Sequence, residues 1–323
     1  MNMLRMNVQP LFAAEHHPVA VTPTGERTTG ALCDLLEQRR EEIAALLIQH
    51  GSILFRDFLI EQPADFRACA QSSGARPFEY IGGNSPRTRV TDDVYTSTDF
   101  PGRDVIGLHN EMSYLPAWPR RIFFFCAKPA PSGGQTTLAH GADVRRALPP
   151  ELLRRFKEKK VTYIRNYHAR AGLGKSWQAS YLTDDRAEVE RVVTAQGSTY
   201  RWSTNGSLRV STSCEALTRH PITGEEVWFN QAEIYHPSAV DVVVRARLEQ
   251  MLGKGQLPYD CEYGDGEPIE EESLAEIRHA LDRCKLLFDW RVGDILMIDN
   301  VLMMHGRERF GGERATFVYL SAT

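Results

Sequence analysis

The sequence predicts a mainly β fold with helices, in which a double-stranded β-helix, or jelly roll, forms the core of a single domain over residues 1–323. Strand-like segments outnumber helical ones and gather after residue 120. Strands and helices do not alternate regularly, and no G-x-G-x-x-G motif follows a strand. These three observations disfavour a doubly wound nucleotide-binding fold.

Helices are predicted mainly near the N-terminus and in one later segment. Residues 31–50 carry leucine and isoleucine at helical spacing and end at Gly51, and residues 63–74 open with a proline, which suits a first helical turn. Later helices are predicted at 149–160, 184–195, 236–253 and 270–284. We interpret residues 236–284 as a helical insertion and residues 1–30 as an N-terminal extension of the same domain.

Short runs rich in β-branched and aromatic residues predict the strands. The first run, residues 52–58, follows the first helical segment directly. The other runs are 121–130, 135–139, 161–168, 198–203, 208–220, 225–232, 286–290, 293–300, 301–306 and 315–322.

Composition excludes several classes of protein. With 42% hydrophobic and 25% charged residues, the chain is expected to fold. A net charge of −4 gives no electrostatic reason to bind nucleic acid or an anionic membrane, and no apolar run reaches the roughly 18 residues of a membrane helix. Six scattered cysteines without a C-x-x-C pair suggest neither a zinc knuckle nor a disulfide framework, so we expect a cytoplasmic protein. No sequence signal indicates an oligomeric state.

A histidine and a glutamate stand two residues apart in "GLHNEMSYLPAWP". On a strand, side chains at i and i+2 point to the same face, so His109 and Glu111 can both face one metal ion while Asn110 points away. His305 is the best candidate for a third ligand, because it closes the apolar strand "VLMMHG". Two histidines and a carboxylate leave one side of a metal open, which suits non-haem Fe(II) that activates oxygen. The alternative is two polar residues at the end of a strand.

Two further residues suit a dicarboxylate co-substrate. Arg314 lies nine residues after His305, just past a Gly-Gly pair, where a guanidinium can make a two-point contact with a carboxylate. Thr136 follows another Gly-Gly turn, and its hydroxyl can give the same carboxylate a second hydrogen bond. The alternatives are a surface arginine at a strand edge and an ordinary β-turn.

In this order, H-x-E, "GGQTTLA" and the histidine of "DNVLMMHGRERFGGER" resemble the Fe(II)- and 2-oxoglutarate-dependent dioxygenases of the taurine dioxygenase (TauD/TfdA-like) family. The resemblance runs from about "SILFRDF" to the C-terminus. It implies that His109, Glu111 and His305 bind iron and that O₂ is a co-substrate. It also implies that Arg314 and Thr136 hold the far carboxylate of 2-oxoglutarate. The single domain is then expected to be a dioxygenase domain.

The carboxylate ligand narrows the resemblance. Glu111 stands where many members of the family have aspartate. In this respect the chain resembles members with glutamate that act on amino acids, such as clavaminate synthase. The stretches "LHNEMSYLPAWPRRIFFFC" and "HPITGEEVWFNQ" are similar to syringomycin-type aspartyl hydroxylases of nonribosomal peptide biosynthesis, which act on a carrier-bound amino acid. Related halogenases have Gly or Ala at this position, which leaves room for chloride, so the resemblance implies oxidation and not halogenation.

Four residues are candidates for contact with the primary substrate. Trp228, Asn230 and Gln231 lie in "VWFNQAEIYH", and Asn84 follows the Gly-Gly of "IGG". The alternative for each is structural, because a strand tryptophan is usually core and an asparagine beside Gly-Gly is usually a turn residue. Arg307 is a candidate for an ion pair that supports the site.

The predicted protein is a non-haem Fe(II)- and 2-oxoglutarate-dependent oxygenase that hydroxylates an amino acid or a carrier-bound aminoacyl group in secondary metabolism. One alternative is desaturation or epoxidation by the same iron centre. Another is a non-catalytic protein that binds 2-oxoglutarate as a sensor. Hydroxylation adds one oxygen to the product, and desaturation removes two hydrogens. A sensor releases no succinate.

Overall fold

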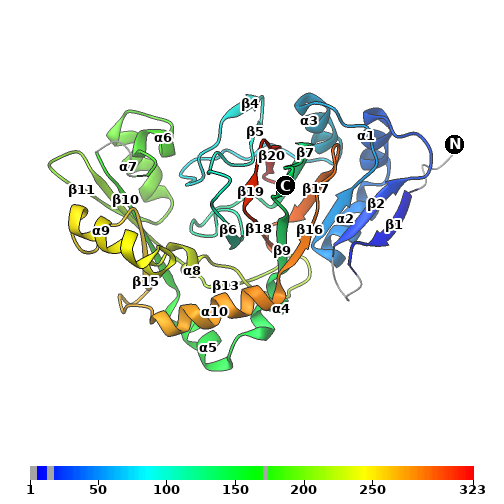
Figure 1. Ribbon diagram of the computed structural model, residues 1–323. Coiled ribbons are helices and arrows are strands. Elements are labelled where there is room, and N and C mark those ends of the chain that lie inside the picture. The colour runs from blue at the N-terminus through cyan, green and yellow to red at the C-terminus, as the bar shows by residue number, and fades with distance from the viewer. Residues whose placement is uncertain (1–5, 13–17, 170–173) are drawn as a thin grey trace.

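The core of the molecule consists of two facing β-sheets (Figure 1). This computed structural model describes residues 6–12, 18–169 and 174–323. The larger sheet has eight strands in the order β1 (Met6–Pro10), β2 (Val19–Pro23), β3 (Ser52–Phe55), β17 (Ile295–Asp299), β7 (Arg121–Lys128), β20 (Ala315–Ser321), β5 (Val94–Thr96) and β4 (Arg89–Thr91). The smaller has four in the order β16 (Leu286–Phe288), β9 (Thr136–His140), β18 (Met303–Arg307) and β6 (Ile106–His109). This arrangement confirms the predicted jelly-roll core.

Alternation along β7 shows how the large sheet buries both faces. Ile122 and Phe124 point into the space between the sheets, where they cluster with Leu138 and Met303 of the smaller sheet. Phe123 and the other outward residues of β7 pack under helices α1 (Thr29–Gln38), α2 (Arg40–His50) and α3 (Pro63–Ser72). The helices therefore shield the outer face, and the inner face is left to the core and the site.

The predicted helix over 31–50 is two helices, because Arg39 leaves helical geometry between α1 and α2. Gly51 ends α2 as expected, with φ near +70°. The predicted N-terminal extension adds β1 and β2 to the edge of the large sheet, where β2 pairs in parallel with β3. Residues 1–5 and 13–17 of that extension lie outside the described part of the chain.

Residues 141–285 form one long excursion between β9 and β16, two strands that pair directly. The excursion stands as a lobe beside the jelly roll (Figure 1). It has its own sheet, in the order β11 (Thr199–Trp202), β12 (Leu208–Cys214), β10 (Val161–Tyr167) and β15 (Tyr259–Tyr263), and the hairpin of β13 (Leu217–Arg219) and β14 (Glu226–Trp228). Its helices are α4 (Gly141–Ala147), α5 (Pro150–Lys159), α6 (Trp177–Tyr181), α7 (Arg186–Ala195), α8 (Ala232–Tyr235), α9 (Val242–Leu252) and α10 (Glu271–Cys284), with a 3₁₀ turn at Pro237–Ala239.

The segment 236–284, predicted as a helical insertion, is the last part of this excursion. It contains α9 and α10, but also β15, a strand that the sequence did not indicate. The run 225–232, predicted as one strand, is a strand only at β14 and then turns into α8. Within the described residues, no helix is long and apolar enough to span a membrane.

Candidate metal centre and adjoining cavity

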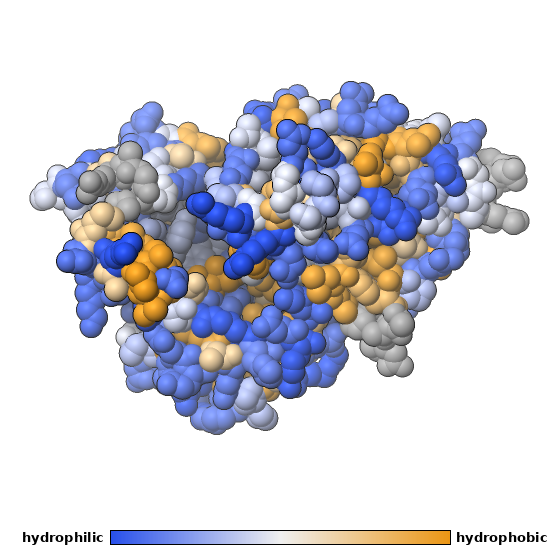
Figure 2. All heavy atoms as spheres, viewed as in Figure 1, coloured by the Kyte–Doolittle hydropathy of each residue, from blue (hydrophilic) through white to orange (hydrophobic). Residues whose placement is uncertain are grey.

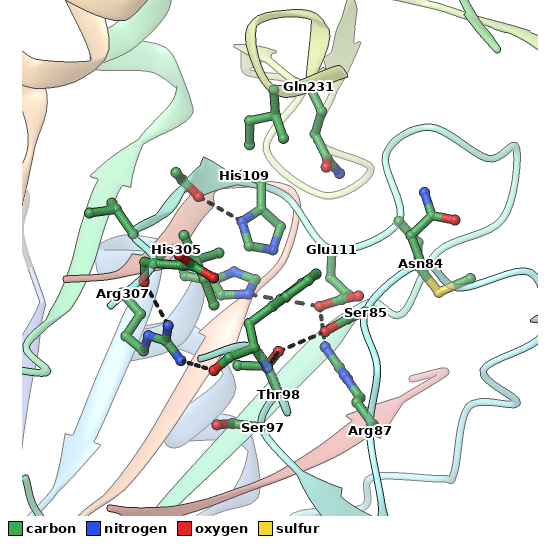
Figure 3. Close-up of a pocket in the computed structure, with 18 of the residues that line it drawn as sticks. Asn84, Ser85, Arg87, Ser97, Thr98, His109, Glu111, Gln231, His305 and Arg307 are labelled. Carbon is green, nitrogen blue, oxygen red and sulfur yellow. Dashed lines mark hydrogen bonds and ion pairs between the residues drawn. The ribbon is translucent and has the colours of Figure 1, made fainter. Parts of the chain in front are cut away.

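Two histidines face each other across neighbouring strands of the smaller sheet. His109 ends β6 and His305 lies in the middle of β18, and the register of the two strands places them directly opposite. Their ring centroids are 4.4 Å apart. Together with Glu111, they offer ligand atoms that all lie within 4.8 Å of one another (Figure 3). One ion is therefore within reach of all three side chains.

Glu111 reaches this position by a different route from the one the sequence suggested. β6 ends at His109, so Glu111 does not share a strand face with it, and Met112 turns the chain away with φ near +59°. Asn300 instead fixes the backbone of Glu111: its side-chain oxygen accepts from the amide of Glu111 at 2.7 Å, and its amide donates to the carbonyl at 3.0 Å. Asn300 precedes β18, so one buried side chain joins the two halves of the triad.

Both histidines are prepared to act as ligands. His109 Nδ1 lies 2.8 Å from the carbonyl of Gly107 and donates to it, which leaves the Nε2 lone pair free. Burial lowers the pKa of His109, and burial together with the neighbouring His109 ring lowers the pKa of His305 well below its ordinary value. The imidazoles are therefore neutral at neutral pH, which is the state that binds a metal.

The donor set fits a non-haem iron. Two imidazoles and one carboxylate meet at one site, and Glu111 Oε2 lies 3.9 Å from His305 Nε2. Three ligands about 2.1 Å from a shared ion and on one face of it stand roughly 3 Å apart, so the three side chains would draw together by roughly 1 to 2 Å to bind it. A two-histidine, one-carboxylate set with open positions is typical of Fe(II) oxygenases.

A cavity of about 650 Å³ opens onto the triad. Arg314 and Thr136 both line it, from the start of β20 and the start of β9. The indole of Trp290 donates to the Thr136 hydroxyl at 2.9 Å, so the hydroxyl proton is free to donate into the cavity. The two residues predicted to bind 2-oxoglutarate therefore line the same cavity as the triad.

Arg314 has the character of an anion-binding residue. Its one hydrogen bond within the described chain is a long contact of 3.4 Å to the hydroxyl of Ser97, and no carboxylate pairs with it there. Burial lowers the pKa of Arg314 to about 10, so the guanidinium is still charged at neutral pH. A half-buried cation that no carboxylate of the described chain pairs with is stabilised by an anionic ligand.

The four candidates for substrate contact divide into two pairs. Asn84 and Gln231 line the cavity. Trp228 and Asn230 do not: Trp228 is fully buried against Phe156 in the core of the lobe, and the side chain of Asn230 is used in hydrogen bonds to the backbone nearby. Trp228 and Asn230 therefore have structural roles and do not face the cavity.

Several residues of the cavity have no counterpart among the sequence predictions. Arg87 pairs with Glu111 through a contact of 2.7 Å, and both side chains are about 5% exposed or less. Tyrosines form much of the remaining wall, at positions 80, 114, 235 and 259. These residues come from loops and from the lobe, where no periodic pattern marks them. Arg307, expected in an ion pair, instead donates to the backbone carbonyls of Pro101 and Asp104.

Comparisons with known proteins agree with this geometry. The model of the family "Taurine catabolism dioxygenase TauD, TfdA family" matches residues 15–320. The dapdiamide synthesis protein DdaC of Enterobacter agglomerans is 33% identical over 97% of this chain and 94% of its own length. A clavaminate synthase-like protein of Arabidopsis thaliana is 24% identical with the same coverage.

Solved structures support the fold. The PvcB protein of Pseudomonas aeruginosa has a TM-score of 0.56 at 15% identity, covering 98% of this chain and 91% of its own. AAD-2, solved with Mn(II) and N-oxalylglycine, has a TM-score of 0.58 at 13% identity, covering 99% and 98%. The chain therefore belongs to the TauD/TfdA dioxygenase family, and the protein is an oxygenase that uses Fe(II), 2-oxoglutarate and O₂.

Proposed function

We propose that this oxygenase hydroxylates an unactivated C–H bond of an amino acid, or of an aminoacyl group on a carrier protein, in the biosynthesis of a secondary metabolite such as an antibiotic. The observation that carries the proposal is a complete triad that opens onto a cavity with hydrogen-bonding groups opposite the metal ligands. The similarity to a dapdiamide synthesis protein supports the biosynthetic setting. Glu111 supports oxidation over halogenation, because its carboxylate occupies the place that a halide would need.

When bound, iron and 2-oxoglutarate would supply the oxidising chemistry, with O₂ as the oxidant and succinate and CO₂ as the co-products. The residues of the chain then have separate tasks. His109, Glu111 and His305 would hold the ion, and a donor set of this kind leaves coordination positions open for co-substrates. Arg314 and Thr136 orient 2-oxoglutarate by its far carboxylate. This orientation leaves the remaining cavity to the substrate.

The far part of the cavity suits an amino acid or its acyl derivative. Tyr114 and Tyr235 pack edge to face against Tyr163 and present aromatic surface that excludes water. Beside them, the side-chain carbonyl of Asn84 has no hydrogen-bond partner among the described residues. A substrate amide or ammonium group offers the donor that this carbonyl lacks.

Helix α9 supports a substrate that arrives on a protein. None of its residues is buried, and Val242, Val243 and Val244 are 64%, 54% and 48% exposed. Apolar surface gathers over α9 beside a hollow in the molecule (Figure 2), and the residues just before it, Ala239 and Val240, line the cavity. Such an exposed apolar strip beside a cavity mouth is typical of an interface.

The other end of α9 supports the same proposal. Lys254, which follows the helix, lines a second cavity of about 520 Å³ with Arg201 and Arg209, and no carboxylate of the described residues lines it. A carrier protein with a phosphopantetheine arm has an apolar contact surface and a phosphate, which match the apolar strip and the basic cavity.

The first test is a screen for succinate release, run with free amino acids and with aminoacyl carrier proteins, and read by mass spectrometry. We expect a product heavier by one oxygen. A loss of two hydrogens would replace hydroxylation by desaturation. If no substrate releases succinate while Fe(II) and 2-oxoglutarate still form their visible charge-transfer band, the proposal fails and a sensor role takes its place.

The second test separates carrier-bound from free substrate. Val243→Asp places a charge in the apolar strip, and Val292→Asp is the matched control, because Val292 is 67% exposed in the turn before β17. We expect Val243→Asp to raise KM for an aminoacyl carrier protein about tenfold and to leave KM for the aminoacyl pantetheine thioester unchanged. Equal KM values for the two variants with the carrier substrate would contradict docking on α9.

A further inference from the structure

A second residue acts directly on the metal ligand Glu111. Arg87, in the loop that precedes β4, donates from Nη2 to Glu111 Oε2 at 2.7 Å (Figure 3). This is also the oxygen that faces His305 Nε2 at 3.9 Å. The hydroxyl of Tyr80 is also close enough to interact with the Glu111 carboxylate. Asn300 fixes the backbone of Glu111, and its two hydrogen bonds with that residue do not include the carboxylate.

Arg87 is held for this contact at a cost. Its guanidinium lies over the ring of Tyr80 at 4.6 Å, and the Tyr80 hydroxyl in turn accepts from the amide of Ser85 at 3.1 Å. Nε and Nη1 of Arg87 are buried and have no partner in the described chain. Burying an N–H group without a hydrogen-bond partner destabilises the fold. Two such groups are buried here while a third N–H of the same guanidinium donates to Glu111.

A glutamate ligand has a physical need for such an anchor. It has one more rotatable bond than aspartate, so a free glutamate loses more side-chain entropy when it binds a metal. A carboxylate oxygen has two lone pairs, and one can accept from Arg87 while the other faces the ion. Outer contacts of this kind orient metal ligands in proteins and add to metal affinity.

We propose that Arg87 is a positioning residue for Glu111: it holds the carboxylate in the rotamer that faces the two histidines, so that the triad is assembled before iron binds. The proposal rests on the metal centre itself and not on the identity of the substrate. Arg87 also lines the cavity, but in this role it acts on the metal centre through Glu111.

The direction of the effect on iron affinity separates positioning from simple electrostatics. Removing a cation beside the site favours binding of Fe²⁺ by charge alone. A loss of affinity on removing Arg87 therefore reports lost positioning. We expect Arg87→Met to weaken Fe(II) binding to the metal-free protein about tenfold or more. Arg314→Met, which removes another cavity arginine, is the matched control, and its Fe(II) affinity without 2-oxoglutarate is expected to be unchanged or slightly higher.

The measurement is an anaerobic Fe(II) titration, repeated with Mn(II) followed by electron paramagnetic resonance, and neither depends on turnover. Thermal unfolding of the metal-free variants is measured beside it. Arg87→Lys keeps the charge on a shorter, unforked side chain, so we expect it to recover only part of the lost affinity. If Arg87→Met binds Fe(II) as tightly as the wild type, or more tightly, the proposal is overturned.

A double-mutant cycle tests whether Arg87 acts through Glu111. The carboxylate of Glu111→Asp is withdrawn by one methylene and does not reach Arg87. In that background, we expect Arg87→Met to change Fe(II) affinity less than about twofold. The same loss in both backgrounds would show a general effect on the fold and would contradict the positioning role. Arg87→Lys in both backgrounds gives the same comparison if the methionine variant fails to fold.

Discussion

The two ends of the cavity are built in different ways. At the cofactor end, His109, His305 and the 2-oxoglutarate residues lie on or beside β6, β9, β18 and β20, whose register fixes their positions, and Asn300 places Glu111 beside them. At the substrate end, the wall comes from the loop of residues 80–87, from α8 and from residues 239–240. Sheet register orders the first end, whereas side-chain contacts between distant segments order the second.

The loop of residues 80–87 shows how much the substrate end depends on the lobe. Arg165, fully buried in β10, donates to the carbonyl of Gly82 at 3.0 Å, and Lys175 donates to the carbonyl of Gly83 at 2.9 Å. The amide of Asn84 donates to the hydroxyl of Tyr114 at 2.9 Å. The lobe therefore holds the loop that carries Arg87 and Asn84, and the excursion between β9 and β16 has a direct role in shaping the site.

The largest expected effect lies at the cofactor end. His305→Ala removes a ligand from the middle of β18, and we expect succinate release to fall roughly 10³-fold or more, with loss of bound iron. His279→Ala on the exposed face of α10 is the matched control. Iron content and succinate release are measured together. Retention of both in His305→Ala would remove His305 from the triad.

The next effect concerns 2-oxoglutarate. Arg314→Leu removes the cavity arginine that lacks a carboxylate, and we expect the apparent Kd for 2-oxoglutarate to rise roughly 30- to 100-fold with little change in Fe(II) affinity. Arg309→Leu, at an exposed position in the preceding turn, is the control. Titration of the charge-transfer band measures the change. A shift of less than threefold would assign Arg314 a structural role.

The same contrast explains which parts of the site the sequence could predict. His109, His305, Thr136 and Arg314 lie on or next to strands with clear apolar patterns, so the motifs and the strands pointed to the same residues. Glu111 was recognised by its spacing, although a turn and Asn300 place it and not the strand period. The spacing of two residues between His109 and Glu111 therefore identified the right ligand, but not for the reason that places its side chain.

The substrate end was beyond such reasoning. Arg87 pairs with a residue 24 positions away, and Asn84 bonds to the hydroxyl of Tyr235, 151 positions away. No periodic pattern in one sequence encodes contacts between loops at these separations. Trp228 and Asn230 were candidates as part of the stretch "VWFNQAEIYH", but β14 ends at Trp228 and both side chains are buried in the core.

The third prediction concerns stability of the substrate end. Glu233, in α8, is buried and its carboxylate has no hydrogen-bond partner among the described residues; burial raises the pKa of Glu233 to about 8. The folded state therefore favours the protonated form. The stability that the fold gains from keeping this carboxyl protonated is fully present below the ordinary pKa of a glutamate. It is lost as the pH rises to about 8.

Glu233→Gln removes that pH dependence. We expect the variant to be more stable than the wild type by about 4 kcal/mol at pH 8 to 9, and the difference to vanish near pH 4 to 5. Glu276→Gln, at an exposed position on α10, is the control. Urea unfolding across this range measures the effect. Parallel curves for wild type and Glu233→Gln would show that the carboxylate is not neutral in the folded state.

The smallest expected effect on KM is at Asn84. This residue can contact the substrate itself or can act by holding Tyr235, and the experiment must distinguish these two roles. Asn84→Ala is expected to raise KM for the substrate about fivefold and to leave Fe(II) and 2-oxoglutarate binding unchanged. Because the Asn84 amide donates to the Tyr235 hydroxyl, Tyr235→Phe tests the supporting role alone. If Asn84 also contacts the substrate, the double variant loses more than Tyr235→Phe does. If the two single variants and the double variant have the same KM, Asn84 acts only by holding Tyr235, and the loop contacts the substrate through the aromatic wall.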